Sequence, residues 1–577
     1  MTESAEYRAA NDAVRGHFFS QVWKLTAPYW RSEEKGTAWL LLIVVIALSL
    51  VGVGVSVWVN TWYRDFYNAL QNKDLDAFIR LILYFCGIAA VAILVAVYRL
   101  YLTQMLTIRW RRWLTEKHFA AWLSDKNYYR LEQRGYTDNP DQRLSEDLNS
   151  FTDTTLSLGL GLIRNLVSLV SFSVILWGVS GSIELFGISI PGYMFWAALL
   201  YALVGSWLTH LIARRLIGLN NQQQRYEADL RFGLVRIREN AESIALYNGE
   251  GSENERLMTR FRNVWGNFWE LMKVQKRLTF FSSGYAQIAI IFPIVVAAPR
   301  YFAGKIQLGE LMQINSAFGN VQDGLSWFID AYSSLATWRA TCDRLLSFRN
   351  AMDEVAGEHE SIAVHAAGNG LQLKHLSLRL GDGSVLLEPT DLALRAGEHV
   401  LISGPSGAGK STLLRAMSGL WRYGAGQVQM PAARTLFLPQ KPYLPIGSLA
   451  TALSYPEAPD RHGPERLREV LRLCRLEHLG ERLDEAQHWQ RLLSPGEQQR
   501  LAIARALLYA PAWLFLDEAT SALDDNDEAA LYQTLLEQLP GVTLVSIGHR
   551  ADLRRFHERQ LRLEDRHLRE VEAVLPA

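Results

Sequence analysis

The sequence predicts two unlike domains: an all-α membrane domain of six transmembrane helices, followed by an α/β domain built on a mainly parallel sheet. Three observations predict this. The 577 residues are too many for one ordinary domain, and 49% of them are hydrophobic although 20% are charged. Apolar runs long enough to cross a bilayer fill much of the first 300 residues. From about residue 371, short β-rich runs alternate with helical stretches.

The membrane domain is predicted from six spans. Five are apolar over about the 20 residues that a helix needs to cross a bilayer. A sixth span is needed to return the chain to its starting side. Residues 308–332 supply it, because their apolar residues recur at alternating spacings of three and four although the segment is less apolar. The five apolar spans are residues 39–59, 78–98, 155–179, 193–217 and 280–298.

Basic residues are distributed unevenly between the loops. Lys and Arg number nine in residues 99–150 and ten in 218–279, against two in 60–77 and none in 180–192. Because cytoplasmic loops carry the excess of basic residues, both long loops and both termini are predicted to be cytoplasmic. The net charge is zero and the pI about 7.2, so no nucleic-acid partner is expected.

The first 38 residues are predicted to be a cytoplasmic N-terminus that carries an elbow helix on the membrane surface. Phe19, Val22, Trp23 and Trp30 fall on one face of a possible helix here. An ordinary soluble amphipathic helix is the alternative. The segment has no short apolar core followed by a small-residue cleavage site, so no cleaved signal is expected.

The domain boundaries follow from composition. The membrane domain is predicted over residues 39–346. Small and acidic residues without apolar periodicity predict a linker over 347–370, and the α/β domain then covers 371–577. Cys86, Cys342 and Cys474 lie far apart in the sequence and match no metal-ligand spacing, so they are expected to be reduced thiols.

A phosphate-binding loop is predicted at residues 404–411. The sequence Gly-Pro-Ser-Gly-Ala-Gly-Lys-Ser follows an apolar strand at 399–403 and precedes a helical run. Such a loop wraps phosphates with backbone N–H groups. Its lysine contacts the β and γ phosphates, and its last serine offers a hydroxyl to Mg²⁺, so ATP and Mg²⁺ are expected. The nucleotide-binding residues predicted here are Gly404, Ser406, Gly407, Gly409, Lys410, Ser411 and Thr412.

Two carboxylates end a second apolar strand, at residues 513–518. Asp517 is predicted to hold Mg²⁺ through water, and Glu518 to polarise the water that attacks the phosphate. An acidic strand end is common by itself, but beside a P-loop it predicts ATP hydrolysis.

Six segments in this order resemble the ATP-binding cassette (ABC) family. Gln440 resembles the Q-loop glutamine, residues 493–497 the signature, Ser521–Asp524 the D-loop and His549 the switch histidine. The resemblance implies an ABC exporter-like fold. It also implies catalytic roles for Glu518, His549 and Gln440, with Gln440 joining Ser411 and Asp517 around Mg²⁺.

In this family two cassettes meet head to tail, so each ATP lies between the P-loop of one and the signature of the other. The resemblance therefore implies that the chain is a half-transporter that pairs with a second half-transporter, expected to be a copy of itself. The residues implied to complete the partner's nucleotide site are Ser494, Gly496, Glu497 and Asp524.

Two features depart from the family pattern. Pro495 and Glu497 stand where most members have Gly and Gln, and no aromatic residue stands near Leu380, where one usually stacks on adenine. Proline is tolerated in the first turn of a helix, so ATPase activity is expected to be kept. The adenine contact stays open.

The membrane half resembles a narrower group. Residues 108–113, 138–143 and 239–250 are similar to the peroxisomal fatty-acyl (ABCD) transporters and their bacterial YddA-type relatives, and this half also resembles the SbmA/BacA peptide-uptake proteins. The resemblance implies an amphiphilic cargo such as fatty-acyl compounds or peptides, and a bacterial inner membrane, with a peroxisomal home and either direction of transport still open. It also implies that residues 139–143 and 239–250 dock on the cassettes. The alternative is that both segments are ordinary charged surface loops without a docking role.

The second face of the predicted sixth span is polar. Ionisable residues within a span usually face the bundle interior or water, so this face is predicted to line a cargo cavity. The alternative is that the lower part of the helix projects into the cytoplasm and its carboxylates are solvated. The predicted cavity residues are Gln313, Asn320, Asp323, Trp327 and Asp330.

Two functions from different classes remain in view. The first is an ATP-driven transporter, and the second is a membrane-anchored ABC ATPase that gates or senses without moving cargo. A soluble ABC ATPase of nucleic-acid maintenance is excluded by the apolar spans.

Overall fold

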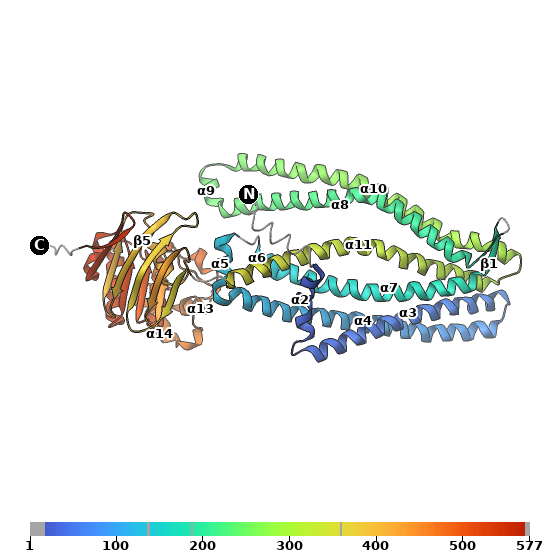
Figure 1. Cartoon of the computed structure of the whole chain (residues 1–577), viewed down its shortest axis with the longest axis horizontal. Helices are drawn as coiled ribbons and strands as arrows, with labels where there is room; N and C mark the ends of the chain where they lie inside the picture. Colours follow the sequence, from blue (N-terminus) through green and yellow to red (C-terminus); the bar gives the residue numbers. More distant parts are fainter. Residues whose placement is uncertain (1–17, 136–138, 186–187, 358–360, 572–577) are drawn as a thin grey trace. The chain divides into compact units, whose positions relative to one another are not determined.

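The computed structural model describes residues 18–135, 139–185, 188–357 and 361–571 (Figure 1). The chain divides into two compact units, Met1–Ala356 and Gly357–Ala577. The first unit is helical and the second is α/β, and each is described by itself.

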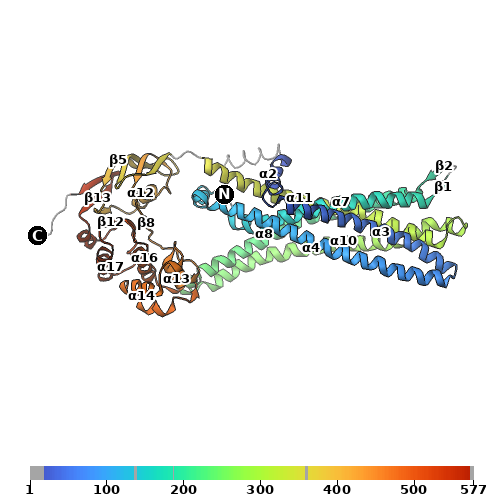
Figure 2. The same ribbon diagram turned by 90° about the horizontal axis from the view of Figure 1, so that it is seen from below.

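The helical unit is built from long helices that run side by side in both views (Figures 1 and 2). Five described helical segments are long and apolar enough to cross a membrane. They contain the five spans predicted from the apolar runs. The long helices are α3 (Lys35–Gln71), α4 (Leu75–Leu123), α7 (Leu148–Ser180), α8 (Tyr193–Glu239), α10 (Glu250–Phe302) and α11 (Leu308–Gly357).

Helix α11 contains the predicted sixth span but is not among the five apolar segments. Its residues Ile314, Phe318 and Val321 are nevertheless buried in one cluster with Phe172 of α7 and Met194 of α8. The predicted apolar stripe is therefore buried in its first part and places α11 in the bundle. Further along α11, Phe328 and Tyr332 are exposed.

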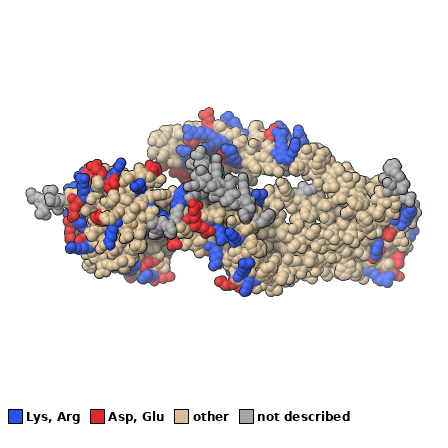
Figure 3. Space-filling model, viewed as in Figure 1, with Lys and Arg blue, Asp and Glu red and all other residues tan. Residues whose placement is uncertain are grey.

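One face of the helical unit carries an uncharged band. Figure 3 shows a broad band without Lys, Arg, Asp or Glu across this unit, with charged side chains on either side of the band. Large apolar side chains such as Ile93, Leu94 and Trp207 are exposed on the helices. An exposed apolar surface of this extent marks contact with lipid or protein, as expected of a membrane domain.

Helix α2 (Phe18–Trp30) lies where the elbow helix was predicted, and residues 1–17 fall outside the described ranges. Its buried stripe is Val22, Leu25 and Tyr29, which packs in a cluster with Leu106 and other residues of α4. Trp23 is 61% exposed. The stripe that packs on α4 shares Val22 with the predicted face but not Trp23, so an elbow with Trp23 toward the membrane surface stays a prediction.

The two loops predicted to be cytoplasmic contain short helical elements. Between α4 and α7 lie η1 (Ser124–Lys126), α5 (Asn127–Arg134), α6 (Pro140–Gln142) and the π-helical η2 (Arg143–Asp147). Asp138 falls outside the described residues. Between α8 and α10 lies α9 (Ala241–Leu246), and a hairpin of β1 (Ser182–Leu185) and β2 (Ile188–Pro191) joins α7 to α8.

The segment predicted to be a linker is partly ordered structure. Helix α11 continues to Gly357, and β3 (Ile362–Ala366) follows within the same segment. Phe348, Met352 and Val355 are buried on one side of α11. These residues have the apolar spacing of a helix, which the small and acidic residues around them obscured.

The α/β unit contains two larger sheets. One has the strand order β14-β13-β6-β12-β11-β8 and the other β3-β7-β4-β5. In the first, β13, β6, β12, β11 and β8 are parallel neighbours, which confirms the predicted mainly parallel sheet. The other strands of these two sheets are β4 (Leu371–Arg379), β5 (Val385–Leu394), β6 (His399–Ser403), β7 (Gly424–Met430), β8 (Thr435–Leu438), β11 (Trp513–Asp517), β12 (Thr543–Ile547), β13 (Arg559–Glu564) and β14 (His567–Val571).

The central strands are buried on both faces. In β11, Trp513 and Phe515 pack in one cluster, while Leu514 and Leu516 pack in the other. Continuous apolar runs of this kind are typical of parallel strands covered on both sides. The longer helices of the unit are α12 (Lys410–Met417), α14 (Pro464–Leu473), α16 (Pro495–Tyr509) and α17 (Asp525–Gln538).

Candidate nucleotide site

Three strands bring the predicted chemistry to one edge of the sheet. Strand β6 pairs in parallel with β12, and β12 with β11. Their carboxyl ends therefore meet at the same edge, where open α/β sheets bind ligands. The P-loop follows β6, Asp517 ends β11, and His549 comes shortly after β12.

The P-loop has a backbone that favours glycine. Gly404 has φ 151° and Gly409 has φ 101°, both on the left-handed side of the map. A Cβ on Gly409 would lie 2.6 Å from Leu386 Cγ, and one on Gly404 would meet the carbonyl of Leu563. Side chains at these positions would displace the loop, so both glycines are required by its shape.

Lys410 opens α12 and is folded back into the loop. Its Nζ donates hydrogen bonds to the carbonyl oxygens of Gly404 and Pro405, both at 2.9 Å. Burial lowers the pKa of Lys410, although the nearby carboxylates of Glu518 and Asp517 act to raise it. A buried ammonium group next to the loop's backbone N–H groups is suited to the phosphates of a nucleotide.

Ser411 and Asp517 form a pair of oxygen groups beside Lys410. Ser411 Oγ donates to Asp517 Oδ1 at 2.8 Å. Burial raises the pKa of Asp517, and the hydrogen bond from Ser411 offsets this only in part. Hydroxyl and carboxylate oxygens are the ligands that Mg²⁺ prefers, so this donor set fits the ion.

Glu518 is held between the Q-loop and the switch histidine. Gln440 Nε2 donates to Glu518 Oε2 at 3.0 Å, and His549 Nε2 lies 3.2 Å from Glu518 Oε1. Glu518 itself has φ 50°, a left-handed value that is uncommon for a residue other than glycine. The fold thus brings together three residues that are far apart in the sequence and turns the carboxylate between the other two.

The signature residues form the N-terminus of α16. Ser494 caps the helix by accepting a hydrogen bond from the Glu497 N–H, and its own N–H and hydroxyl donate to Glu497 Oε2 at 2.8 Å each. Pro495 occupies the first turn, where proline is tolerated. Within the described part of the chain, Ser494, Gly496 and Glu497 make no hydrogen bond to the P-loop.

Glu497 has an additional neighbour that the sequence did not predict. His478 Nε2 lies 3.1 Å from Glu497 Oε1. Burial acts to raise the pKa of Glu497, but the hydrogen bonds from Ser494 and His478 outweigh it and lower the pKa. The carboxylate that replaces the family's usual amide is thus stabilised in its charged form.

Asp524 of the D-loop caps the next helix. Its Oδ1 accepts a hydrogen bond of 2.7 Å from the N–H of Asp527, at the start of α17. Arg550, which directly follows His549, contacts Asp525 at 3.1 Å and Glu528 at 3.4 Å on the same helix. The sequence did not predict this role of Arg550.

Two aromatic residues lie beside the turn that contains Leu380, where the sequence itself has no aromatic residue. Leu380 is 39% exposed in the turn between β4 and β5. Trp421 Nε1 donates to the carbonyl of Arg379 at 3.0 Å, and the carbonyl of Tyr423 accepts from the Arg379 N–H at 2.8 Å. The rings of Trp421 and Tyr423 lie 5.5 Å apart. In the sequence, only the position of these two residues shortly after α12 could have indicated that they lie beside this turn.

The polar face of α11 is divided between two environments. Gln313 is buried against α3, where its Nε2 donates to Asn60 Oδ1 at 3.1 Å. The Asn60 side chain donates in turn to the backbone carbonyl of Gln313. Asn320 is half-buried and donates to the Ser316 carbonyl, while Asp323 is exposed.

Trp327 packs against Gly161 of α7, and a Cβ on this glycine would lie 2.8 Å from the indole ring. The side chain of Asp330 lies outside the described residues. Of the predicted cavity residues whose side chains are described, Asp323 is thus exposed, Asn320 and Trp327 are half-buried, and Gln313 is buried.

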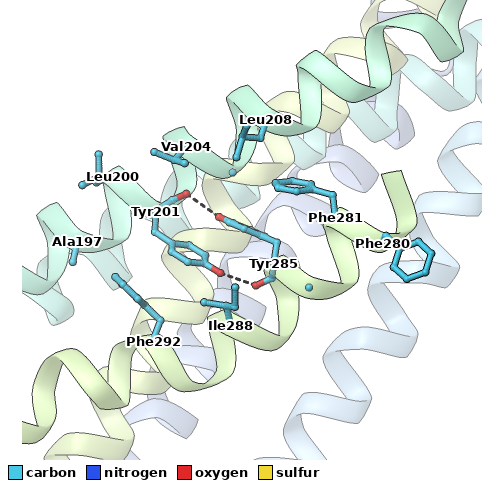
Figure 4. Close-up of a pocket in the computed structure, with 12 residues that line it drawn as sticks. Ala197, Leu200, Tyr201, Val204, Leu208, Phe280, Phe281, Tyr285, Ile288 and Phe292 are labelled. Atoms are coloured by element: carbon cyan, nitrogen blue, oxygen red, sulfur yellow. Dashed lines mark hydrogen bonds between the residues drawn. The ribbon is translucent and has the colours of Figure 1, made fainter. Parts of the chain in front are cut away.

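An apolar pocket of about 570 Å³ lies between α8 and α10 (Figure 4). Tyr201 and Tyr285 stack with ring centroids 4.4 Å apart. Each hydroxyl donates to the other residue's carbonyl, at 2.6 and 3.0 Å. Both tyrosine hydroxyls are therefore hydrogen-bonded within the pair. The rest of the pocket wall is mainly hydrocarbon and includes Phe281 and Phe292.

The comparisons with known proteins cover both units. Residues 25–302 match the family model "ABC transporter transmembrane region 2", and residues 387–521 match the model "ABC transporter". The chain is similar over 92% of its length to a bacterial Atm1-family ABC exporter with ATP bound, with a TM-score of 0.71 at 19% identity and 94% coverage of that chain. This likeness confirms the predicted fold of a helical transmembrane domain with an α/β nucleotide-binding domain.

Curated relatives match almost the whole chain. ABC transporter D family member 2 of Arabidopsis thaliana is 36% identical, over 94% of this chain and 86% of its own length. The inner membrane ABC transporter ATP-binding protein YddA of Escherichia coli is 35% identical, over 91% and 94%. The human lysosomal cobalamin transporter ABCD4 is 30% identical, over 94% of each chain.

These relatives have both units in the same order, and the second unit of this chain carries the residues of an ABC ATPase, which uses ATP with Mg²⁺. ATP hydrolysis by this domain is coupled to transport, and ABC exporters of this architecture work as dimers. The chain belongs to the ABC transporter family and is a half-transporter of the ABCD and YddA type, with its membrane domain and ATPase fused in one polypeptide.

Proposed function

We propose that two copies of this chain form a homodimer in a bacterial inner membrane, with both termini cytoplasmic, and that ATP hydrolysis drives an amphiphilic cargo across the membrane. The observation that carries this proposal is the arrangement of Glu518 between Gln440 and His549, beside Lys410 and the Ser411–Asp517 pair. This cluster lies in the same polypeptide as a bundle of membrane-spanning helices.

Each chain would bind one ATP through its own P-loop. Lys410 would hold the β and γ phosphates, and Ser411, Asp517 and Gln440 would hold Mg²⁺, which neutralises charge on the phosphates. The oxygen of the attacking water would form a bond to the γ phosphorus while the bond from that phosphorus to ADP breaks. Glu518 would take the proton that the water loses. Gln440 and His549 would orient the Glu518 carboxylate. Their present contacts with Glu518 support these roles.

The second copy would complete the site. Ser494 is exposed at the N-terminus of α16, where its hydroxyl and the helix dipole favour an anion. Ser494 and Gly496 would therefore meet the γ phosphate bound to the partner, with Glu497 beside them holding Ser494 and Asp524 nearby in the D-loop. Residues 139–143 and the α9 region would dock on the cassettes and pass their movement to the membrane helices.

The cargo is proposed to be amphiphilic. Asn320 and Asp323 offer polar groups on α11, and the pocket between α8 and α10 is almost wholly apolar. A cargo with an apolar body and polar groups suits both surfaces. Fatty-acyl compounds and peptides are therefore the first candidates. Because the human relative is named as a cobalamin transporter, cobalamin belongs in the same screen.

Reconstituted vesicles separate transport from the alternative of a membrane-anchored ATPase that only gates or senses. The purified chain is placed in vesicles with each labelled candidate cargo, and ATP-dependent accumulation is measured. We expect accumulation with at least one cargo, and its complete loss in Lys410→Ala, because the P-loop ammonium group is removed. ATP hydrolysis without movement of any cargo in the screen would favour the gating function.

Asp323→Asn tests the proposed cargo face. Losing a hydrogen bond to a charged group costs about 1.5–3 kcal/mol, so we expect cargo affinity to fall roughly tenfold or more. Basal ATPase activity should stay unchanged, because Asp323 belongs to the helical unit and every ATP-site residue belongs to the α/β unit. Cargo-stimulated ATPase activity and uptake are the measurements, and Asp76→Asn on α4 is the control. Unchanged cargo stimulation in Asp323→Asn would remove this residue from the cargo site.

A further inference from the structure

One buried amide joins two loops of the ATPase unit to helix α16. Gln499 lies on α16, two residues after the end of the signature, and is 4% exposed. Its Nε2 donates to the backbone carbonyl of Gln440 at 3.1 Å and to Ser521 Oγ at 3.2 Å. Its Oε1 accepts from the Ala522 N–H at 2.8 Å. A glutamine amide has two N–H donors and one acceptor oxygen, so Gln499 uses one donor on the Q-loop and its other donor and its oxygen on the D-loop.

The two loops and α16 belong to different parts of the chemistry. Gln440 is the Q-loop residue whose side chain holds Glu518 at 3.0 Å, in the ATP site of its own chain. Ser521 and Ala522 are in the D-loop, where the Ser521 N–H also donates to the Glu518 carbonyl at 3.1 Å. Helix α16 itself begins with Ser494, which the proposed function places against the partner's ATP.

We propose that Gln499 is a positioning residue that makes the two ATP sites of the dimer respond to each other. The proposal rests on the proposed function, because it takes the roles of Gln440, Glu518 and Ser494 from there. Movement of the Q-loop when one ATP binds pulls on Gln499, which lies in the helix that contacts the other ATP. The same side chain carries the movement to the D-loop.

The burial of Gln499 is what makes this connection effective. Hydrogen bonds are stronger in a water-excluded environment, and a buried polar group left without a partner is costly. If one loop moved alone, the Gln499 amide, the Gln440 carbonyl or the Ala522 N–H would lose its partner. The two loops and α16 are therefore favoured to move together, which couples the two sites without any direct contact between nucleotides.

The experiment uses the full chain in lipid nanodiscs and measures ATPase rate against ATP concentration. Two coupled sites give a Hill coefficient above ~1 and up to about 2 in the unaltered chain. In Gln499→Met, which keeps the length but removes all three hydrogen bonds, we expect the coefficient to fall to about 1 and kcat to fall more than KM rises. In Gln499→Glu, the bond from Ala522 is kept and the donors are lost, so an intermediate coefficient is expected.

Leu507→Ala is the matched control. Leu507 is buried on the same helix but packs in the apolar core away from these loops. This variant should lower the melting temperature while keeping the Hill coefficient, which separates coupling from mere stability. If Gln499→Met does not fold, Gln499→Glu carries the same test.

Two results would overturn the inference. One is an unaltered Hill coefficient in a folded Gln499 variant, and the other is a coefficient of about 1 in the unaltered chain. Failure of the proposed function is distinguishable from both, because it would appear as ATPase activity that survives Lys410→Ala.

Discussion

Glu518→Gln is expected to lower ATP hydrolysis by about 10²–10⁴-fold while ATP binding is retained, because a general base contributes a factor of this size. The amide has nearly the shape of the carboxylate but cannot take a proton from water. The contacts of Lys410 and the Ser411–Asp517 pair do not involve the Glu518 side chain, so the phosphate-binding groups stay in place. ATP should therefore bind, remain intact and hold the two cassettes closed.

The measurement combines steady-state ATPase assays with the amount of ATP that stays bound after gel filtration. The unaltered chain should release its nucleotide as ADP, whereas Glu518→Gln should retain ATP. Glu481→Gln, an exposed carboxylate of the same unit, is the control and should behave as the unaltered chain. Wild-type turnover in Glu518→Gln would show that another group polarises the water.

The ATP site could be predicted in detail because its parts are short local motifs. Residues 404–411 specify a loop and the start of a helix within eight positions, and Asp517 and Glu518 are adjacent at the end of a strand. Their meeting in space follows from parallel strand order alone. Contacts between loops could not be predicted in this way. Gln499 and His478 act through side chains whose partners lie 19 to 59 residues away.

The helical unit was predicted less completely. Apolar runs specify where helices cross a membrane but not which of their faces pack together. The stripe of α2 that packs on α4, made of Val22, Leu25 and Tyr29, was not predicted, and α11 runs further than its composition indicated. The Asn60–Gln313 contact joins residues 253 positions apart, so Gln313 was predicted to face a cavity when its amide is buried between α3 and α11.

A buried carboxylate in the helical unit is paired with arginine, and its replacement is the second substitution for which we expect a large effect. Asp147, at the end of η2, has a side chain that is 4% exposed. Its oxygens accept two hydrogen bonds from Arg344 of α11, at 2.8 and 2.6 Å, and one from Arg143 at 2.9 Å. The carboxylate thus ties the start of α7 to the part of α11 that leads toward the ATPase unit.

Asp147→Asn is expected to destabilise the helical unit by about 2–3 kcal/mol, because hydrogen bonds to a charged group contribute about 1.5–3 kcal/mol and solvent partly screens Arg344, which is 40% exposed. The melting temperature of the detergent-solubilised chain, followed by tryptophan fluorescence, should fall clearly. Asp353→Asn, on the same helix as Arg344, is the matched control. Its carboxylate is 72% exposed and lies 3.8 Å from Arg349, so its loss should change stability by no more than about 0.5 kcal/mol. Equal effects of the two variants would contradict the importance given to burial. A double variant, Asp147→Asn with Arg344→Gln, should recover part of the loss, because it removes the uncompensated guanidinium group as well.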